Sequence, residues 1–349
     1  MKSIARSLSQ FFDRLTYSQR FTMITLVFVI PVIAFTPLIT DQITNIRRYG
    51  ISELSGTIYL RSLWKLSEDL QDYVTAAHQY SDGEIQLSEL QAIQSTVEVS
   101  LNAFQLTHIQ YGESLQLGNN ADTIKNQWSD VKVAVQNSDW DTFKLNQSTL
   151  FESIASLTSQ VGDLSYLILD PDLDTYYMMD TVLIKGPENQ SLAFETNQLA
   201  EQAVVHGTFT AEEKTQLIIL IGRLEANLDA MNRNIGIAIQ NDQTGEMAGI
   251  ISSPLDNYQN KLRKYSDLVY ASLNSASNAP IQNPEKVFNE IKTAYLEVHR
   301  SDLEFYNGAS ASLELGIRHR ITVLTTRLIL MTAIALLAWV RVARACARA

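Results

Sequence analysis

Two short stretches of the chain carry residue types that could bind a small molecule. In YLRSLWKL, Arg61 and Trp64 lie among apolar residues at helical spacing. A guanidinium on the inner face of a helix could hold a carboxylate through two hydrogen bonds, so an organic acid or another anion is the expected ligand. The alternative is that Arg61 pairs with an acid of the chain, such as Glu53, or is solvated. In LDPDLDTYYMMD, Tyr176 and Tyr177 could contribute to a small-ligand pocket.

The acidic part of that second stretch also resembles the start of a calcium loop. Asp170, Asp172 and Asp174 alternate with other residues, as the first ligands of an EF-hand do. An EF-hand needs Gly at its sixth position and Glu at its twelfth, where this chain has Thr175 and Thr181. An EF-hand is therefore excluded, and a looser divalent-cation site is left as an alternative.

The simpler interpretation of DPDLD is a junction between two helices. Leu169 would end one helix, Pro171 would prevent its continuation, and Asp170 or Asp172 would cap the next. Acids in a first turn also favour the positive end of the helix dipole. Three residues of the second helix would then lie in the core: Tyr176, Met179 and Leu183.

Enzymatic chemistry finds little support in the sequence. The five histidines are scattered without HxxxH or HExxH spacing, and no Walker, GxSxG or GxGxxG motif occurs. The single cysteine, Cys346, lies among arginines close to the C-terminus. We expect no catalytic residue, no metal site and no cofactor.

The elements that must position a binding site begin with two apolar runs. Residues 21–40 contain no charged residue, and residues 321–340 contain only Arg327. A helix of about 20 residues crosses a bilayer core of about 30 Å, so both runs are expected to be transmembrane helices. The first run is long for a signal peptide and is followed by no small-x-small cleavage site, which favours an uncleaved anchor.

Basic residues flank both runs on the side away from the chain centre. They are Lys2, Arg6, Arg14 and Arg20 before the first run, and Arg341, Arg344 and Arg348 after the second. Because cytoplasmic flanks are enriched in Lys and Arg, residues 1–20 and 341–349 are expected in the cytoplasm and residues 41–320 in the periplasm of a bacterium. The expected location is the bacterial inner membrane.

The region between the runs is strongly acidic. Residues 41–320 hold 19 basic and 37 acidic residues, a net charge of −18. Nucleic acid is therefore not expected as a partner of this region. With no cysteine in it, the region must be stabilised by its apolar core.

Apolar residues recur in this region at steps of three and four, which predicts an all-α fold. The clearest stripes begin at Tyr59, Leu90, Leu150, Leu217 and Leu255. Turn formers separate the stripes into about eight helices, with a capping box at Thr210 and Glu213 and a helix start at Pro284. A helix over residues 41–79 alone would be about 58 Å long, so we expect an elongated domain of two up-down bundles. Their boundary is expected near residues 170–174.

Three segments resemble the sensor region of bacterial methyl-accepting chemotaxis proteins and related sensor histidine kinases. They are RFTMITLVFVIPVIAF, YGISELSGTIYLRSLWKLSEDLQDY and VGDLSYLILDPDLDTYYMMD, of which the last is the most specific. The resemblance covers residues 15–185 by motif and the remainder only by helical pattern. It implies a dimeric, ligand-sensing transmembrane receptor and does not identify the ligand.

The expected function is therefore the sensory module of a signal-transduction receptor, chemoreceptor-like, which passes ligand-induced helix displacements across the membrane. Two alternatives are the sensor part of a histidine kinase or diguanylate cyclase, and a membrane-anchored helical module that binds another protein. Residues 341–349 are too few for an output domain, so we expect a truncated sensor, a gene fragment or a receptor that acts through partners.

Overall fold

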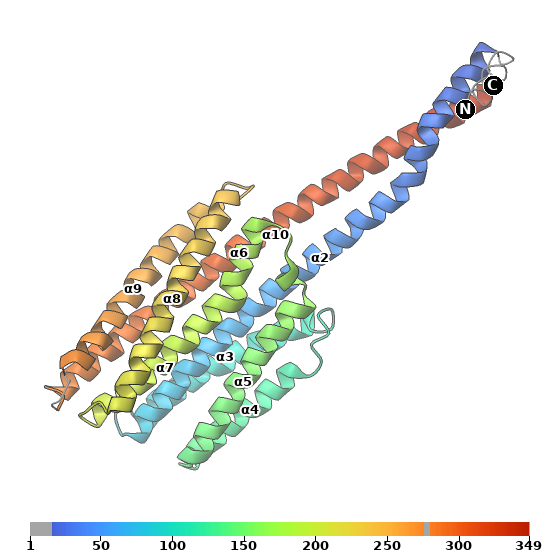
Figure 1. The fold of residues 1–349 in the computed structure, drawn as a ribbon. Helices are drawn as coiled ribbons and strands as arrows, with labels where there is room; N and C mark the ends of the chain where they lie inside the picture. Colours follow the sequence, from blue (N-terminus) through green and yellow to red (C-terminus); the bar gives the residue numbers. More distant parts are fainter. Residues whose placement is uncertain (1–15, 276–279, 349) are drawn as a thin grey trace. The chain divides into compact units, whose positions relative to one another are not determined.

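The computed structural model describes residues 16–275 and 280–348, and over these residues the chain is helical with no β-strand. The α-helices are α2 (Tyr17–Ser81), α3 (Leu87–Tyr111), α4 (Asn120–Gln136), α5 (Trp140–Leu164), α6 (Leu173–Met179), α7 (Gly186–Val205), α8 (Ala211–Asn241), α9 (Met247–Ser275) and α10 (Pro284–Arg348). A 3₁₀ turn, η1 (Leu167–Leu169), precedes α6, and a π-helix, η2 (Asp180–Lys185), joins α6 to α7. The prediction of an all-α chain is confirmed (Figure 1).

The chain divides into two compact units. The first comprises Met1–Ile51 and His319–Ala349, and the second comprises Ser52–Arg318. Helices α2 and α10 have bounds that extend from one unit into the other. Residues 1–15 and 349 of the expected cytoplasmic segments lie outside the described part of the chain.

The first unit contains the two apolar runs. Both α2 and α10 are long and apolar enough to cross a membrane, and in neither is the apolar window buried against protein. Within this unit Arg47 Nε donates a hydrogen bond to Thr325 Oγ1 at 3.1 Å. A Cβ added to Gly50 would lie 3.0 Å from Ile321, so α2 and α10 approach closely there. Two candidate membrane spans, as predicted, are thus present.

In the second unit, α2 packs with α3, α4 and α5 through aromatic contacts. The Tyr59 ring meets Phe104 of α3 edge-on at 5.4 Å, and Tyr73 meets Trp128 of α4 at 4.7 Å. His78, near the end of α2, contacts Phe143 of α5 at 5.4 Å. The side of α2 that these rings occupy is therefore covered by three helices.

Helices α7, α8, α9 and α10 form a second set of mutual contacts. Asn189 of α7 donates to Tyr258 of α9 at 2.8 Å, and Asn227 of α8 donates to Asn189 at 3.3 Å. The Tyr258 ring stacks on Phe305 of α10 with 5.0 Å between centroids. Tyr258 therefore lies where three of the four helices meet.

Contacts between the two sets run through α2 and α5 on one side and α7 and α10 on the other. Trp64 of α2 stacks on Tyr306 of α10, with ring centroids 3.7 Å apart and an angle of 8° between planes. Phe151 of α5 meets Phe194 of α7 at 5.8 Å. In Figure 1 the α3–α5 helices and the α8–α9 helices lie on opposite sides of this seam.

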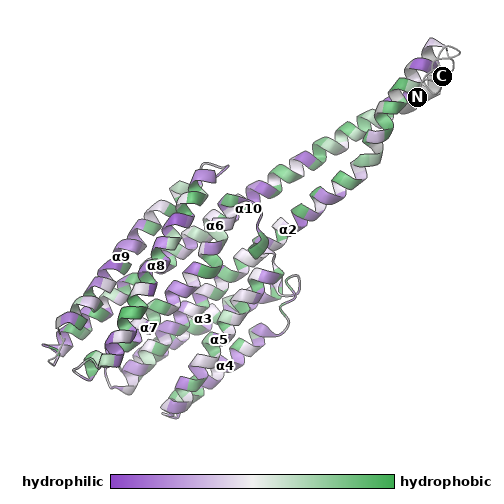
Figure 2. Ribbon diagram, viewed as in Figure 1, coloured by the Kyte–Doolittle hydropathy of each residue, from purple (hydrophilic) through white to green (hydrophobic). Residues whose placement is uncertain are grey.

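The predicted apolar stripes form the core of this unit. All six stripe residues of α2 from Tyr59 to Ala77 and all six of α8 from Leu217 to Ile235 are buried. The α5 stripe is buried from Leu150 to Val161, but Leu164 and Ile168 are exposed because α5 ends at Leu164. Figure 2 shows hydrophobic and hydrophilic residues interleaved along each helix, as helices with one buried face require.

The predicted helix boundaries are partly confirmed. Thr210 and Glu213 form the expected capping box at 3.1 and 2.8 Å, and α10 begins at Pro284. The DPDLD segment is a junction, but the preceding helix ends at Leu164 rather than Leu169. Asp172 occupies the N-cap position of α6 without a side-chain capping hydrogen bond.

Tyr176 corrects one expectation about the helix that follows. Met179 and Leu183 are buried as predicted, whereas Tyr176 is 41% exposed. Tyr176 lies in the first turn of a seven-residue helix, and the π-helix that begins at Asp180 changes the helical phase. A uniform α-helical spacing therefore does not describe residues 173–186.

Candidate functional site

A cleft of about 360 Å³ lies along the seam between the two sets of helices. That volume is at the lower end of the range of small-molecule sites. Helices α2, α5 and α7 contribute most of its lining, and Tyr306 comes from α10. We name it the amide cleft after four glutamines in its lining: Gln71, Gln147, Gln190 and Gln198.

Five residues of the amide cleft each carry a buried polar atom that has no hydrogen-bond partner. The atoms are Trp64 Nε1, Gln71 Oε1, Gln147 Oε1, Gln190 Nε2 and Gln198 Nε2. Three of these side chains belong to residues that are nearly inaccessible, with exposed fractions of 5% for Trp64, 4% for Gln71 and 6% for Gln190. An unsatisfied buried polar group costs about 1–3 kcal/mol, so the set favours a molecule that supplies the missing partners.

The lining of the cleft is neutral or acidic. Glu152 and Glu195 are its charged residues, both exposed at the edge, and none of its described lining residues is Lys, Arg or His. Trp64, Phe151 and Phe194 contribute aromatic surface. The cleft therefore offers hydrogen bonds and apolar faces without a positive charge.

The start of α7 comes close to Trp64 and Tyr306 in the lining of the cleft because Gly186 has no side chain. A Cβ added to Gly186 would lie 3.5 Å from both Trp64 and Tyr306, and 3.0 Å from the Thr181 carbonyl oxygen. The π-helix just before it is tied to α8, where Asn227 Nδ2 donates to the Lys185 carbonyl oxygen at 2.7 Å. Gln190 then accepts a hydrogen bond from Ser67 Oγ at 3.3 Å. These contacts fix α7 beside α2.

Trp64 is the one predicted ligand-binding residue that lines the amide cleft. Arg61, one helical turn earlier, is paired instead: its Nη2 atom lies 2.7 Å from Glu314 Oε1 of α10. The expected partner Glu53 is thus replaced by an acid from the other set of helices. An anionic ligand at Arg61 would have to displace Glu314.

Tyr176 and Tyr177 lie beside each other, with ring centroids 5.3 Å apart, and neither lines the amide cleft. The acids before them form local contacts. Asp170 Oδ1 accepts hydrogen bonds from Thr175 Oγ1 at 2.7 Å and from the Asp172 amide at 3.1 Å. Among the described residues no group of acids and histidines has an arrangement that could hold a metal ion, so the divalent-cation alternative is not supported.

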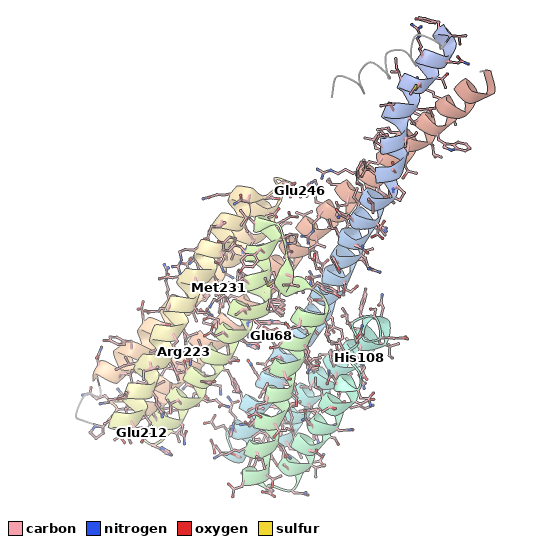
Figure 3. All side chains as sticks on the ribbon, turned by 45° about the vertical axis from the view of Figure 1, so that its right-hand side comes forward. Glu68, His108, Glu212, Arg223, Met231 and Glu246 are labelled. Atoms are coloured by element: carbon pink, nitrogen blue, oxygen red, sulfur yellow. The ribbon has the colours of Figure 1, made fainter. Side chains whose placement is uncertain are left out.

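A carboxyl cluster lies on the same helices, α2 and α10. Its buried members are Glu68, Asp69 and Asp302, and the half-buried Asp72 and His299 complete it. Lys65 Nζ contacts Asp69 at 2.7 Å, and His299 Nε2 contacts Asp72 at 3.2 Å. Asp302 hydrogen-bonds to Tyr258, which extends the cluster to α9. Glu68 is labelled in Figure 3, near the middle of the helices of the second unit.

Burial raises the pKa values of two carboxyl groups in this cluster, Glu68 and Asp302. It raises the pKa of Glu68 to about 8, with a smaller contribution from the negative charge of Asp302. Burial also raises the pKa of Asp302 to about 8, against the hydrogen bond from Tyr258. For His299, burial lowers the pKa, but the hydrogen bond and charge of Asp72 outweigh it and the net shift is upward. Near pH 7, Glu68 and Asp302 therefore retain their protons.

A second cleft of about 540 Å³ adjoins the amide cleft, because Gln147 and Gln198 line both. Its mixed lining includes Lys144, His206 and Glu201. Burial raises the pKa of Glu201 to about 7. Lysine and histidine side chains are thus available here and not in the amide cleft.

Sequence reasoning missed the glutamines of the amide cleft. Gln71 lies within the predicted stripe region of α2, where Ser67 and Glu68, one turn earlier, are also buried polar residues. Gln147, Gln190 and Gln198 belong to helices whose polar faces contain many similar residues. Burial, which separates Gln190 from a solvated glutamine, becomes visible only when α2, α5 and α7 are assembled.

No family model, curated protein or solved structure matches the chain.

Proposed function

We propose that the protein is the ligand-sensing, membrane-anchored part of a bacterial signal-transduction receptor. In this proposal residues 21–40 and 321–340 cross the inner membrane and the helical unit between them is periplasmic. The two sets of helices, α2–α5 and α7–α10, are the two up-down bundles of the sensor. The output is chemotactic signalling, or the activity of a kinase or cyclase that the receptor controls.

The observation that carries the proposal is the amide cleft. Its unpartnered polar atoms include two on α2, Trp64 Nε1 and Gln71 Oε1, and its lining includes Tyr306 of α10. Those are the two helices that contain the apolar runs. A molecule bound in the cleft therefore touches the same helices that enter the membrane.

The mechanism is a shift between two packings of the seam. A ligand that hydrogen-bonds to α2, α5 and α7 together stabilises the packing that brings these helices to it, by its difference in affinity for the two states. Displacements of about 1–2 Å are typical of such helix interfaces. Because α2 and α10 belong to both units, such a displacement is passed to the apolar runs.

An exposed apolar strip on α3 supports the proposal that the receptor is a homodimer. Val99, Leu106 and Ile109 are 70%, 68% and 78% exposed. Apolar residues grouped on one face commonly mark an interaction surface. We expect Leu106→Glu to convert a dimer of the full chain to a monomer in multi-angle light scattering, with Leu145→Glu, at an equally exposed leucine of α5, as the control.

Cysteine crosslinking between the two apolar runs tests the receptor function. Cys346, the only cysteine, is first changed to Ser, and pairs of cysteines are then placed in residues 21–40 and 321–340 of the full chain in membrane vesicles. A molecule that binds the periplasmic side should change the rate of disulfide formation for some pairs and not others. Identical rates with and without every bound molecule would contradict the proposal.

The topology has its own test. A reporter that is active only in the periplasm should be active when inserted at the Ser81–Leu87 loop and inactive when fused after Ala349. The reverse pattern would place the helical unit in the cytoplasm and remove the basis for a periplasmic sensor.

A further inference from the structure

We propose that the amide cleft binds an uncharged polyhydroxylated molecule, of the sugar or polyol class, rather than an anion. This inference rests on the proposed receptor function and assigns the ligand chemistry of the same site. It replaces the sequence-based expectation of an organic acid at Arg61.

The unpartnered atoms require both kinds of hydrogen-bonding group from a ligand. Trp64 Nε1, Gln190 Nε2 and Gln198 Nε2 are donors, whereas Gln71 Oε1 and Gln147 Oε1 are acceptors. A hydroxyl group both donates and accepts, so neighbouring hydroxyls on one molecule can satisfy the whole set. Gln190 is already oriented, because its Oε1 accepts from Ser67 and leaves Nε2 for the ligand.

The charges at the cleft argue against the other ligand classes. A carboxylate or phosphate would be desolvated with no Lys, Arg or His among the described lining residues, and close to Glu152 and Glu195. An ammonium group could pair with these acids, but it has donors only and would leave Trp64 Nε1 and the glutamine Nε2 atoms unsatisfied. An uncharged ligand avoids both costs, and Glu152 and Glu195 can accept hydrogen bonds from its hydroxyls.

The apolar part of the lining fits the same class. Trp64, Phe151 and Phe194 lie beside the polar atoms in one cleft. The ring of a sugar carries C–H groups between its hydroxyls, and these pack on aromatic surface while the hydroxyls are hydrogen-bonded.

The test is calorimetric titration of the full chain in lipid nanodiscs. The probes are glucose, galactose, ribose, myo-inositol and sucrose for the proposed class, succinate and glutamate as anions, and putrescine as an amine. Calorimetry is required because sugars excluded from a protein surface raise its melting temperature without binding. We expect saturable binding of at least one of the first five probes and of none of the others at the amide cleft.

Two variants locate the binding and one serves as a control. Gln190→Met removes the amide donor while keeping the length of the side chain, and Trp64→Phe removes the indole donor while keeping an aromatic ring. Each should weaken binding by about tenfold or more. Gln127→Met is the matched control, since Gln127 also has a buried unpartnered Oε1 atom but does not line the cleft. It should leave the affinity unchanged.

Three outcomes would overturn the ligand assignment. In the first, none of the five sugar and polyol probes binds saturably. In the second, such a probe binds, but neither Gln190→Met nor Trp64→Phe weakens its binding. In the third, only an anion or an amine binds, and its binding depends on Gln190. The last outcome removes the ligand class and keeps the receptor. If a sugar binds but crosslinking between the apolar runs does not change, the ligand assignment is supported and the proposed receptor function is contradicted.

Discussion

The amide cleft and the carboxyl cluster lie within two turns of each other on α2, yet they respond to burial in different ways. Glu68 and Asp302 are buried acids whose pKa values rise to about 8, so each is protonated and uncharged near pH 7. Gln71 and Gln190 are buried amides, which do not titrate. Their desolvation cost remains until another group supplies a hydrogen bond.

This difference separates a structural role for the carboxyl cluster from a binding role for the amide cleft. None of the five cluster residues lines either cleft, whereas all five residues that carry the unpartnered atoms line the amide cleft. The cluster residues can therefore affect the stability of the fold. The residues that line the cleft can also contact a bound molecule.

The largest expected effect is the pH dependence of stability that comes from Glu68. The unfolded glutamate has a pKa of 4.5 and the folded one a pKa of about 8, so between these values the folded state binds the extra proton. Stability from this group therefore falls as pH rises through that window and is constant above it, with a total change of about 3–5 kcal/mol. Glu68→Gln should match the wild type near pH 4 and exceed it near pH 9.

Chemical denaturation of the two proteins across this pH range measures the effect. Glu68 also interacts electrostatically with Asp302, His299, Lys65 and Asp72, and the comparison of the two proteins removes most of the contribution of these groups. If the free energy of unfolding depends on pH in the same way for the wild type and Glu68→Gln, Glu68 is ionised in the folded state. The cluster would then not differ from the buried amides by keeping a proton.

A partnered buried amide should behave differently from an unpartnered one. Asn189 is fully buried and hydrogen-bonds to Tyr258 and Asn227, so Asn189→Leu removes two buried hydrogen bonds at once. We expect a loss of about 2–3 kcal/mol in the free energy of unfolding. A loss as small as that of the neighbouring Gln190 substitution would remove the distinction on which the cleft assignment depends.

The ion pair between Arg61 and Glu314 should contribute less. The Arg61 side chain is 36% exposed and that of Glu314 15% exposed, so solvent screens the pair. We expect Arg61→Gln to lower stability by about 1 kcal/mol and a double-mutant cycle with Glu314→Gln to give a smaller coupling. Because Arg61 lies outside the cleft lining, sugar binding should be unchanged. A large loss of affinity would instead make Arg61 part of the site.

The smallest expected effect is that of Gln190→Met on the protein without ligand. The substitution removes a buried Nε2 atom that has no partner, although it also removes the acceptor of the Ser67 hydrogen bond. These effects oppose each other, so stability should stay within about 0.5 kcal/mol of the wild type. Thermal melts in nanodiscs measure this, and a strong destabilisation would mean that Gln190 is a structural residue.

The fold could be predicted from the sequence to the extent that each helix encodes its own buried face. The stripes of α2 and α8 are buried throughout, and the capping box at Thr210 begins α8 where the sequence placed it. The prediction was wrong for Tyr176, because no propensity rule signals the π-helix at Asp180–Lys185.

The site was harder to predict because it depends on several helices at once. Trp64 was found, since an indole among polar and apolar residues is conspicuous in sequence. The partner of Arg61, Glu314, is more than 250 residues away, and a local search proposed Glu53 instead. Periplasmic location, dimerisation and the boundary near residues 170–174 stay predictions.

The π-helix before α7 fixes the rotational register of everything that follows it. One residue in an α-helix corresponds to a rotation of about 100°, so a chain one residue shorter between Asp180 and Lys185 would turn the face of α7 by that angle. Gln190 and Gln198 would then leave the cleft together, and Gly186 would no longer oppose Trp64 and Tyr306. A single insertion or deletion at this point is thus enough to exchange the entire α7 wall of the cleft for a different set of side chains.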